Sequence, residues 1–418
     1  MKFSFVFSTL FILAAFFLQG CLKDNCTKTF TIYRPVYKSK QEIRNSIKST
    51  APRDIKHAGK IALIGNMIFL NEVDKGIHII DNSNPTQPKK ISFIEMPGNI
   101  DIAVKGSVLY ADLYSELITL DVNNPLSVTV KQIKVNAFPQ RVYPNGFVSD
   151  TSMYISDWVA KDTTVESSCN GNSRLFEMNQ SFIVSANTQT GNITAASGSV
   201  GINGSMARFA ILNNYMYTVS NSEIKVFDIS NTVNPVQTNT VSIGWGIETI
   251  YPFKNNLFIG SNTGMFIYGT QNPAAPNRLG SFAHAFACDP VIADDNYAYV
   301  TLKGGTDCRN ANLNQLDIIN VQNLQTPFLI KSYPMSGPLG LAKDNGLLFV
   351  CDGKDGLRIF DATNPFDLKQ IKQFKNMETY DVIAWNNHAI VVTKDALVQF
   401  DYSNTGNIIE SSRIVIIK

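Results

Sequence analysis

The feature that most constrains the fold of this chain is a short strand-and-turn unit that recurs along its length. In residues 357–365 an apolar segment, Leu-Arg-Ile-Phe, is followed by Asp361 and then by an Asn-Pro step. Eight segments of this kind occur, at residues 77–80, 117–120, 181–184, 224–227, 265–268, 316–319, 357–360 and 397–400. Successive segments begin 40, 64, 43, 41, 51, 41 and 40 residues apart. A period of roughly 40 to 45 residues, with several short strands in each unit, is typical of a β-propeller.

Each copy of the unit has the same internal order. In the second copy, apolar segments at 100–104, 108–111 and 117–120 are followed by a more polar one at 128–135, with turn residues between them. Four short strands joined by Gly, Asn or Asp turns form one antiparallel sheet. The apolar content of the first three predicts burial between neighbouring sheets, and the polar fourth predicts an outer edge.

The repeats therefore predict an all-β fold, a β-propeller of four-stranded antiparallel blades. The blades are expected near residues 53–96, 97–136, 137–200, 201–244, 245–284, 285–334, 335–376 and 377–418. We favour eight blades, with seven as the alternative, because the copy at 137–200 matches the unit least well. A chain of 418 residues exceeds the usual limit for one core. A propeller avoids this limit because each blade packs only on its neighbours.

An aspartate follows the apolar segment in five of the copies. Its side chain can accept hydrogen bonds from backbone N–H groups two or three residues on, and a following proline cannot continue a strand. We therefore interpret these aspartates as turn residues and not as metal ligands. They are Asp81, Asp121, Asp228, Asp361 and Asp401.

The repeated pattern resembles the LVIVD-repeat family of bacterial and archaeal cell-surface proteins, including Bacteroidetes-like lipoproteins. The family's name echoes apolar strands that end in Asp, such as residues 77–81 of this chain. The resemblance covers about residues 52–416 and implies a β-propeller at the cell surface. It supplies no catalytic residues, so it bears on the fold more than on the function.

The N-terminus has the features of an export signal. Lys2 precedes an apolar run at 3–18, which is short for a transmembrane helix and is followed at once by polar residues. Residues 1–20 are therefore expected to be a signal peptide. The closing Leu-Gln-Gly-Cys resembles a bacterial lipobox, with Cys21 as the lipid-bearing residue. The alternative is an ordinary secretory signal with a coincidental cysteine. An exported lipoprotein of the outer membrane or cell surface is the expectation.

The segment after Cys21 is polar and is expected to be a tether over residues 21–51, with the propeller domain at 52–418. Residues 41–48 suit a short helix docked on a blade. Residues 29–33 alternate in polarity and suit an extra strand on the outside of a blade.

The cysteines other than Cys21 are expected to oxidise where they meet, since the chain is exported. We expect a disulfide between Cys288 and Cys308, which would hold the loop 303–312. Cys169 either pairs with Cys26 or stays free. Cys351 lies in an apolar strand and is expected to be a buried, unreactive residue. Cys-x-x-Cys spacing does not occur, which disfavours a zinc site.

Charged residues near the starts of the innermost strands form the candidate ligand-binding site. When the copies are aligned, seven of the eight predicted blades have a charged residue at the same level of the innermost strand. The remaining predicted blade has Gly340 there. The seven charged residues are Lys60, Asp101, Arg141, Arg208, Glu248, Asp289 and Asp381. One interpretation is a set of ion pairs that seals the channel. The other is a polar pocket at the channel mouth, with Phe138, Trp245, Phe286 and Tyr380 as stacking faces.

Other chemistry finds little support in the sequence. The net charge is +2 with scattered Lys and Arg, so no nucleic-acid groove is expected. The four histidines lack metal-ligand spacing, and the calcium-like stretches at 294–296 and 352–356 fit hairpin turns. We expect no metal, no cofactor and no catalytic residues. Enzymatic activity stays open but is disfavoured.

The function expected from the sequence is that of a monomeric, lipid-anchored envelope module that binds a protein or glycan. The alternative is a small polar-ligand receptor or enzyme with its site at the charged mouth. A structural subunit of an envelope complex is a third possibility.

Overall fold

The computed structural model of this chain describes residues 25–141, 143, 152–168, 191–193, 199–288, 290–305 and 313–417. The chain divides into two compact units. One comprises Met1–Lys38 and Ile155–Phe182, and the other comprises Ser39–Tyr154 and Ile183–Lys418.

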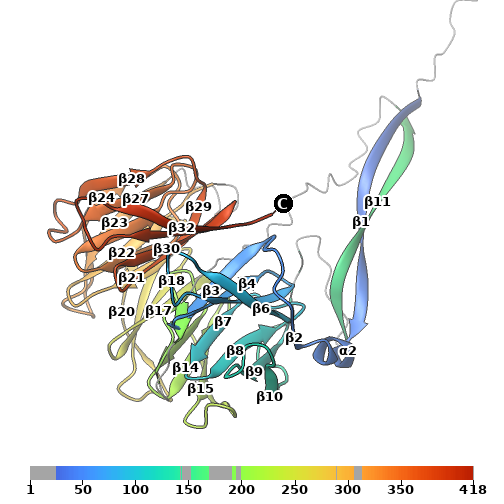
Figure 1. Cartoon of the computed structure of the whole chain (residues 1–418). Helices are drawn as coiled ribbons and strands as arrows, with labels where there is room; N and C mark the ends of the chain where they lie inside the picture. The colour runs from blue at the N-terminus through green and yellow to red at the C-terminus, as the bar shows by residue number, and fades with distance from the viewer. Residues whose placement is uncertain are drawn as a thin grey trace, which may run out of the picture. The chain divides into compact units, whose positions relative to one another are not determined.

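The larger unit is a β-propeller, as the repeats predict (Figure 1). Its described residues form seven sheets, each containing four consecutive antiparallel strands. The first strands of successive blades contact one another, so they are the innermost strands of the ring.

The strands of each blade follow one another in the chain from the innermost to the outermost. Blade 1 consists of β3 (Ala58–Gly65), β4 (Met67–Glu72), β5 (Gly76–Asp81) and β6 (Lys89–Glu95), and blade 2 of β7 (Ile102–Lys105), β8 (Val108–Leu113), β9 (Glu116–Asp121) and β10 (Thr129–Lys134). Blade 3 consists of β13 (Phe209–Leu212), β14 (Tyr215–Val219), β15 (Glu223–Asp228) and β16 (Val236–Ser242), and blade 4 of β17 (Ile247–Phe253), β18 (Asn256–Ser261), β19 (Gly264–Gly269) and β20 (Asn277–Ala283). Blade 5 consists of β21 (Val291–Ala293), β22 (Tyr297–Leu302), β23 (Gln315–Asn320) and β24 (Phe328–Pro334), and blade 6 of β25 (Leu341–Asp344), β26 (Leu347–Cys351), β27 (Leu357–Asp361) and β28 (Lys369–Phe374). Blade 7 consists of β29 (Thr379–Trp385), β30 (His388–Thr393), β31 (Ala396–Asp401) and β32 (Ile409–Val415).

The favoured count of eight blades is wrong, and the alternative of seven is what the described residues form. The copy expected at 137–200 does not build a blade. Its long strand β11 (Met153–Ser168) pairs instead with β1 (Asn25–Ser39), and its short strand β12 (Gly191–Ile193) pairs parallel with β3 of blade 1. A strand that finds its partner in the N-terminal segment cannot also join a four-stranded blade. The apolar segment at 181–184 lies outside the described residues.

Apolar side chains fill every interface between neighbouring blades. They form seven clusters among the described residues, six between successive blades and one between blade 7 and blade 1. In the closing cluster, Leu70 and Ile80 of blade 1 lie with Ile390 and Leu397 of blade 7, all nearly inaccessible to solvent. Side-chain packing therefore closes the ring.

Few backbone contacts between blade 7 and the N-terminal segment accompany this closure. The Ile417 N–H donates to the Ile55 carbonyl at 2.7 Å, next to a parallel bridge between Ile55 and Ile416. The buried side-chain amides of Asn82 and Gln399 exchange two hydrogen bonds, at 3.0 and 2.7 Å. Each blade keeps its own fourth strand.

The repeated aspartate has the turn role that its position predicts. In all five copies one carboxylate oxygen accepts from the backbone N–H two residues on, as Asp81 does from Ser83 at 2.8 Å. Tyrosines of the second strands tie these turns to the preceding blade. Tyr110 donates to the Thr232 carbonyl at 2.7 Å, and Tyr217 donates to the Pro273 carbonyl at 2.9 Å.

The segment before the first blade packs on the outside of the propeller. Helix α2 (Lys40–Asn45) has a capping box formed by Ser39 and Glu42, and its Ile43 is buried against blades 1 and 2. Strand β2 (Lys48–Thr50) then pairs with β6 and extends the outer edge of blade 1. The short docked helix is thus found close to its expected position. The extra outer strand comes from residues 48–50 and not from 29–33, which lie in β1.

The smaller unit contains a two-stranded sheet built from β1 and β11. Polar side chains connect its strands: the Thr31 hydroxyl donates to Asp162 at 2.7 Å, and the Ser156 hydroxyl donates to the Val36 carbonyl at 3.1 Å. We call this sheet the ribbon.

A buried histidine makes blade 1 sensitive to acid. His78 is 0% exposed, and Nε2 lies 2.8 Å from a Glu72 oxygen that also accepts from Arg53 at 3.2 Å. Burial lowers the pKa of His78, because the imidazolium would lose its hydration, although Glu72 opposes this. His78 is therefore neutral in the folded state near neutral pH.

Acidification should reduce stability through His78. Below its ordinary pKa of about 6.5, the unfolded chain binds a proton that the folded chain still resists. The unfolding free energy therefore falls as the pH drops from about 6.5 toward the lowered pKa that His78 has in the folded state. His78→Gln, which keeps a donor for Glu72 but does not titrate, should flatten this slope in urea titrations. His57→Gln, at an exposed histidine, is the control. Equal slopes in wild type and His78→Gln would contradict the assignment.

Candidate functional site

Five of the predicted site residues lie at or near the starts of the innermost strands. Lys60 is in β3, Asp101 immediately precedes β7, and Arg208 immediately precedes β13. Glu248 and Asp381 are in β17 and β29. Because the innermost strands of a propeller run in the same direction, their starts share one end of the channel. Asp289 lies outside the described residues.

Lys60 and Asp101 form a buried ion pair between blades 1 and 2. Lys60 is 2% exposed and Asp101 is 3% exposed, and the ammonium donates directly to the carboxylate. The same carboxylate oxygen accepts from the Arg208 backbone N–H of blade 3 at 3.0 Å. Burial lowers the pKa of Lys60, although Asp101 opposes this shift. Asp101 thus joins three blades at this end of the ring.

Arg141 is held by a different set of groups. Its guanidinium donates to the Asp74 carboxylate and to the Gly98 carbonyl, and it lies 3.4 Å from Asp112 and 4.8 Å from the centre of the Tyr114 ring. Burial disfavours its charged form, but the two carboxylates outweigh burial and raise the pKa of Arg141. These contacts belong to blades 1 and 2.

Asp112 anchors the chain segment that leads into the second blade. One of its oxygens accepts from the Ile100 N–H at 2.7 Å and the Asp101 N–H at 2.8 Å, and from the Asn99 amide at 2.9 Å. Burial nevertheless raises the pKa of Asp112 to about 6. Its contacts place Asp101 against Lys60, although sequence reasoning did not single out Asp112.

The other predicted residues have individual surroundings. The Arg208 side chain is half-buried, and its Nε has no hydrogen-bond partner among the described residues. Glu248 is half-buried, whereas Asp381 is 0% exposed and accepts from the Val382 N–H at 2.9 Å. A Cβ added at Gly340 would lie 1.7 Å from an Asp381 oxygen, so the glycine makes room for this carboxylate.

A returning segment of the chain covers the inner strands of the first two blades. The Ile202 N–H donates to the Leu63 carbonyl at 3.1 Å, and the Gly201 N–H donates to the Val104 carbonyl at 2.7 Å. Ser199 accepts from the Gly106 N–H at 2.8 Å. The sequence analysis did not predict this role of residues 199–202. The extra chain length between the repeats that form blades 2 and 3 was the feature that could have indicated it.

The cysteine predictions have mixed outcomes. Cys351 is a free, buried thiol, as predicted, and burial raises its pKa. Cys288 is disulfide-bonded. Its pairing with Cys308 stays a prediction, because Cys308 lies outside the described residues, as do Cys21 and Cys169.

In the part of the chain that the structure describes, no three His, Cys, Asp or Glu side chains are arranged to hold a metal ion. The described helix is too short and too polar to cross a membrane.

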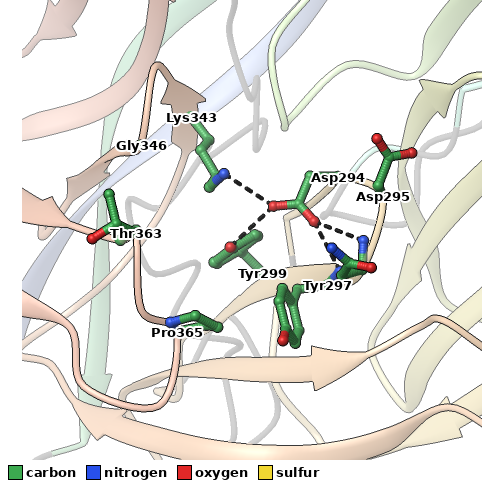
Figure 2. Close-up of a pocket in the computed structure, with 10 residues that line it drawn as sticks. Asp294, Asp295, Tyr297, Tyr299, Lys343, Gly346, Thr363 and Pro365 are labelled. Atoms are coloured by element: carbon green, nitrogen blue, oxygen red, sulfur yellow. Dashed lines mark hydrogen bonds and ion pairs between the residues drawn. The ribbon is translucent and has the colours of Figure 1, made fainter.

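A pocket of about 310 Å³ lies where blades 5 and 6 meet (Figure 2). It lies near the turns that end the innermost strands β21 and β25, at the end of the ring opposite Lys60. Asp294, Tyr299 and Lys343 meet in its wall: Asp294 accepts from Tyr299 at 3.1 Å and forms an ion pair with Lys343 at 3.0 Å. The residues 294–296 do form the expected hairpin turn, but sequence reasoning missed the pocket beside it.

The comparisons with known proteins agree with this architecture. The LVIVD repeat is found at residues 56–93 and 203–242, which correspond to blades 1 and 3. The chain thus carries two matched LVIVD repeats within a β-propeller fold. No curated protein matches it.

Two of the solved structures that resemble this chain in fold have TM-scores of at least 0.50. One is the computationally designed protein Ika8, with a TM-score of 0.51 and 8% identity, covering 88% of this chain and 91% of that chain. The other is a protein from Lactobacillus plantarum, with a TM-score of 0.50 and 12% identity, covering 78% of this chain and 86% of that chain. At these identities the similarity shows the fold alone.

Removal of Asp101 should destabilise the propeller strongly. Asp101→Leu leaves Lys60 buried without a counter-charge, which costs about 3–5 kcal/mol of unfolding free energy. The double variant Lys60→Met/Asp101→Leu should recover most of this loss, because it removes both buried charges. Urea denaturation at neutral pH measures both effects.

The exposed pair Lys90–Asp54 provides a matched control for this experiment. Asp54→Leu should leave the unfolding free energy nearly unchanged, since water screens the pair. A loss in Asp101→Leu no larger than that in Asp54→Leu would show that the buried pair has no structural role.

Proposed function

We propose that this protein is a lipid-anchored module of the cell envelope that binds a protein or glycan partner without catalysing a reaction. The observation that carries this proposal is the ribbon, which exposes apolar side chains. Ile32 is 39% exposed, Val36 36%, Tyr37 39% and Val159 56%. Ile32 and Val36 share one face of β1, because side chains alternate along a strand, and apolar side chains exposed on one face mark interaction sites.

The geometry of the ribbon supports the same function. Among the described residues the ribbon has two strands, and the outer edges of a two-stranded sheet can pair with strands from other chains. A two-stranded sheet is also only marginally stable by itself in water. A partner strand or surface that covers the ribbon would stabilise it while using the exposed apolar residues.

The charged mouth supports a structural role more than a chemical one. Asp101 is engaged by Lys60 and by the backbone of Arg208, and Arg141 is engaged by Asp74, Gly98 and Asp112. Charges that neutralise one another inside the ring are less accessible to a ligand. These contacts favour binding on other surfaces of the protein.

A second candidate function, a small polar-ligand receptor or enzyme at the mouth, has one observation in its favour. The buried Nε of Arg208 has no hydrogen-bond partner among the described residues, and Arg208 lies close enough to Lys60 to lower its pKa. An anionic group bound at Arg208 would accept a hydrogen bond from Nε and would offset the positive charges of Arg208 and Lys60.

The proposed anchor rests on residues 1–21, with an apolar run that ends at a lipobox-like cysteine. A lipid on Cys21 would hold the protein at the outer membrane or cell surface. In the producing cells, the protein should incorporate a labelled fatty acid, and Cys21→Ser should abolish the labelling. Unchanged labelling of Cys21→Ser would contradict lipidation at this residue.

Photocrosslinking in intact cells tests the ribbon as a partner site. A photoreactive phenylalanine analogue in place of Tyr37 should give a discrete cross-linked product. The same analogue at Leu126, an exposed apolar residue of the propeller, is the control. Ile32→Ser/Val159→Ser should reduce the Tyr37 product severalfold by removing apolar contact area. Identical products from positions 37 and 126, or no product from position 37, would overturn the proposal.

A further inference from the structure

The interface between blades 5 and 6 departs from the packing used elsewhere in the ring. In every blade the residue directly after the turn position is buried. These residues are Asn82, Val122, Ile229, Thr270, Val321, Ala362 and Tyr402. Ala362 is the smallest of them, and it lines the pocket shown in Figure 2.

The next interface, between blades 6 and 7, shows what a larger residue does at this position. Tyr402 is 2% exposed, and its ring centre lies 4.9 Å from that of Phe349. Its hydroxyl donates to Asp344 at 2.6 Å. Asp344 comes three residues before the start of β26, as Asp294 comes three residues before the start of β22. Blade 7 thus fills with Tyr402 the space that Ala362 leaves open.

The hydrogen bonding around the pocket departs from the repeat as well. Tyr110 and Tyr217 donate to the turn of the next blade, whereas Tyr299 donates to Asp294 within its own blade. The other Asp294 oxygen accepts from the N–H groups of Asn296 and Tyr297, both at 2.9 Å. Burial would raise the pKa of Asp294, but the N–H groups and Lys343 outweigh it and lower the pKa. Asp294 is therefore a fixed carboxylate that holds the wall in place.

The charges around the pocket are balanced in pairs. Lys343 pairs with Asp294, and Asp295 pairs with Lys254. A wall without net charge gives no electrostatic preference to an anion or a cation. The balance therefore favours a neutral ligand.

The remaining groups suit a ligand with both hydroxyl groups and an apolar face. Thr363 and Asn296 are exposed. The Thr363 hydroxyl donates to Asp361 at 2.6 Å and can accept from a ligand, and the Asn296 amide nitrogen can donate. Tyr297 and Pro365 give an aromatic and aliphatic surface (Figure 2). A pocket of about 310 Å³ is at the small end of the range for ligand sites. We propose that this pocket binds one unit of a neutral saccharide.

A neighbouring hollow favours a sugar chain over a free monosaccharide. A hollow of about 140 Å³ between blades 4 and 5 shares Asp294 and Asp295 with the pocket. Gln322 lies in its wall and donates to Asn296 at 3.0 Å, which links the two hollows. The second hollow would accept part of an adjacent sugar unit.

Saturation-transfer NMR with the purified protein tests the site. The probes are glucose, galactose, mannose, N-acetylglucosamine and their β1,4-linked disaccharides, with glucuronate and glucosamine as charged comparators. At least one neutral sugar should receive saturation, more strongly than the charged comparators, and a disaccharide should exceed its monosaccharide. Equal signals from a disaccharide and its monosaccharide would show a site for a free sugar. Absence of signal from all neutral probes would overturn the proposal.

Two variants locate the binding. Ala362→Tyr, which copies blade 7, should fill the pocket and weaken binding at least about tenfold. Thr363→Ala should weaken it between about two- and tenfold by removing one hydrogen bond. Ser403→Ala, at the same position in blade 7, should leave binding unchanged. Circular dichroism shows whether Ala362→Tyr folds. If it does not fold, the comparison of Thr363→Ala with Ser403→Ala tests whether the sugar binds in this pocket. Wild-type affinity in the folded pocket variants would place the sugar elsewhere and refute the site.

This inference goes beyond the proposed function, because the pocket is on the propeller and not on the ribbon. If no sugar binds, the crosslinking test of the ribbon is unaffected. If the ribbon gives no crosslinked product, the sugar-binding test of the pocket is likewise unaffected.

Discussion

The burial of each blade against its two neighbours is the constraint on which the rest of this structure depends. A four-stranded sheet with two apolar faces has no stable form alone, because both faces must leave water. Seven clusters of apolar side chains provide that burial, and the cluster between blade 7 and blade 1 has the same character as the other six. Closure therefore needs no exchange of strands, and the N-terminal segment is available for α2, β2 and the ribbon.

Polar groups act at the two ends of this apolar ring. At one end, Asp101 receives Lys60 and the backbone of Arg208, so one carboxylate serves three blades. At the other end, aspartate side chains hold the turns, and tyrosine hydroxyls connect blade 2 to blade 3 and blade 3 to blade 4. Buried charges need partners, and the ring provides partners from neighbouring blades. The same rule explains why charged residues at a channel mouth need not bind a ligand.

Sequence patterns predicted what depends on residues close together in the chain. The strands, the aspartate turns, the docked helix and the buried Cys351 all follow from local pattern, and each is found. The pairing of distant segments did not follow. Nothing near residues 153–168 in sequence indicates that this strand pairs with residues 25–39, so its copy was counted as a blade.

The site shows the same division between local and distant information. Alignment of the repeats placed Lys60 beside Asp101 correctly at one end of the channel. Arg141 was assigned to that ring although Asp74 and Asp112 hold it, because its register depended on an insertion. The pocket was missed because it arises from the small size of Ala362 opposite Asp294, two residues 68 positions apart. Only the comparison with Tyr402 in the folded ring makes that difference visible.

With the proposed sugar site, the departure from the repeat at Ala362 serves binding and not folding. The most direct measurement is the unfolding free energy of Ala362→Tyr beside that of Tyr402→Ala, by urea denaturation. Filling a pocket that folding does not need should leave stability unchanged or raise it. Emptying the equivalent space in blade 7 should cost about 3–5 kcal/mol. If Ala362→Tyr instead destabilises the protein as much as Tyr402→Ala does, then the alanine is required by packing, and the pocket is a by-product of the fold.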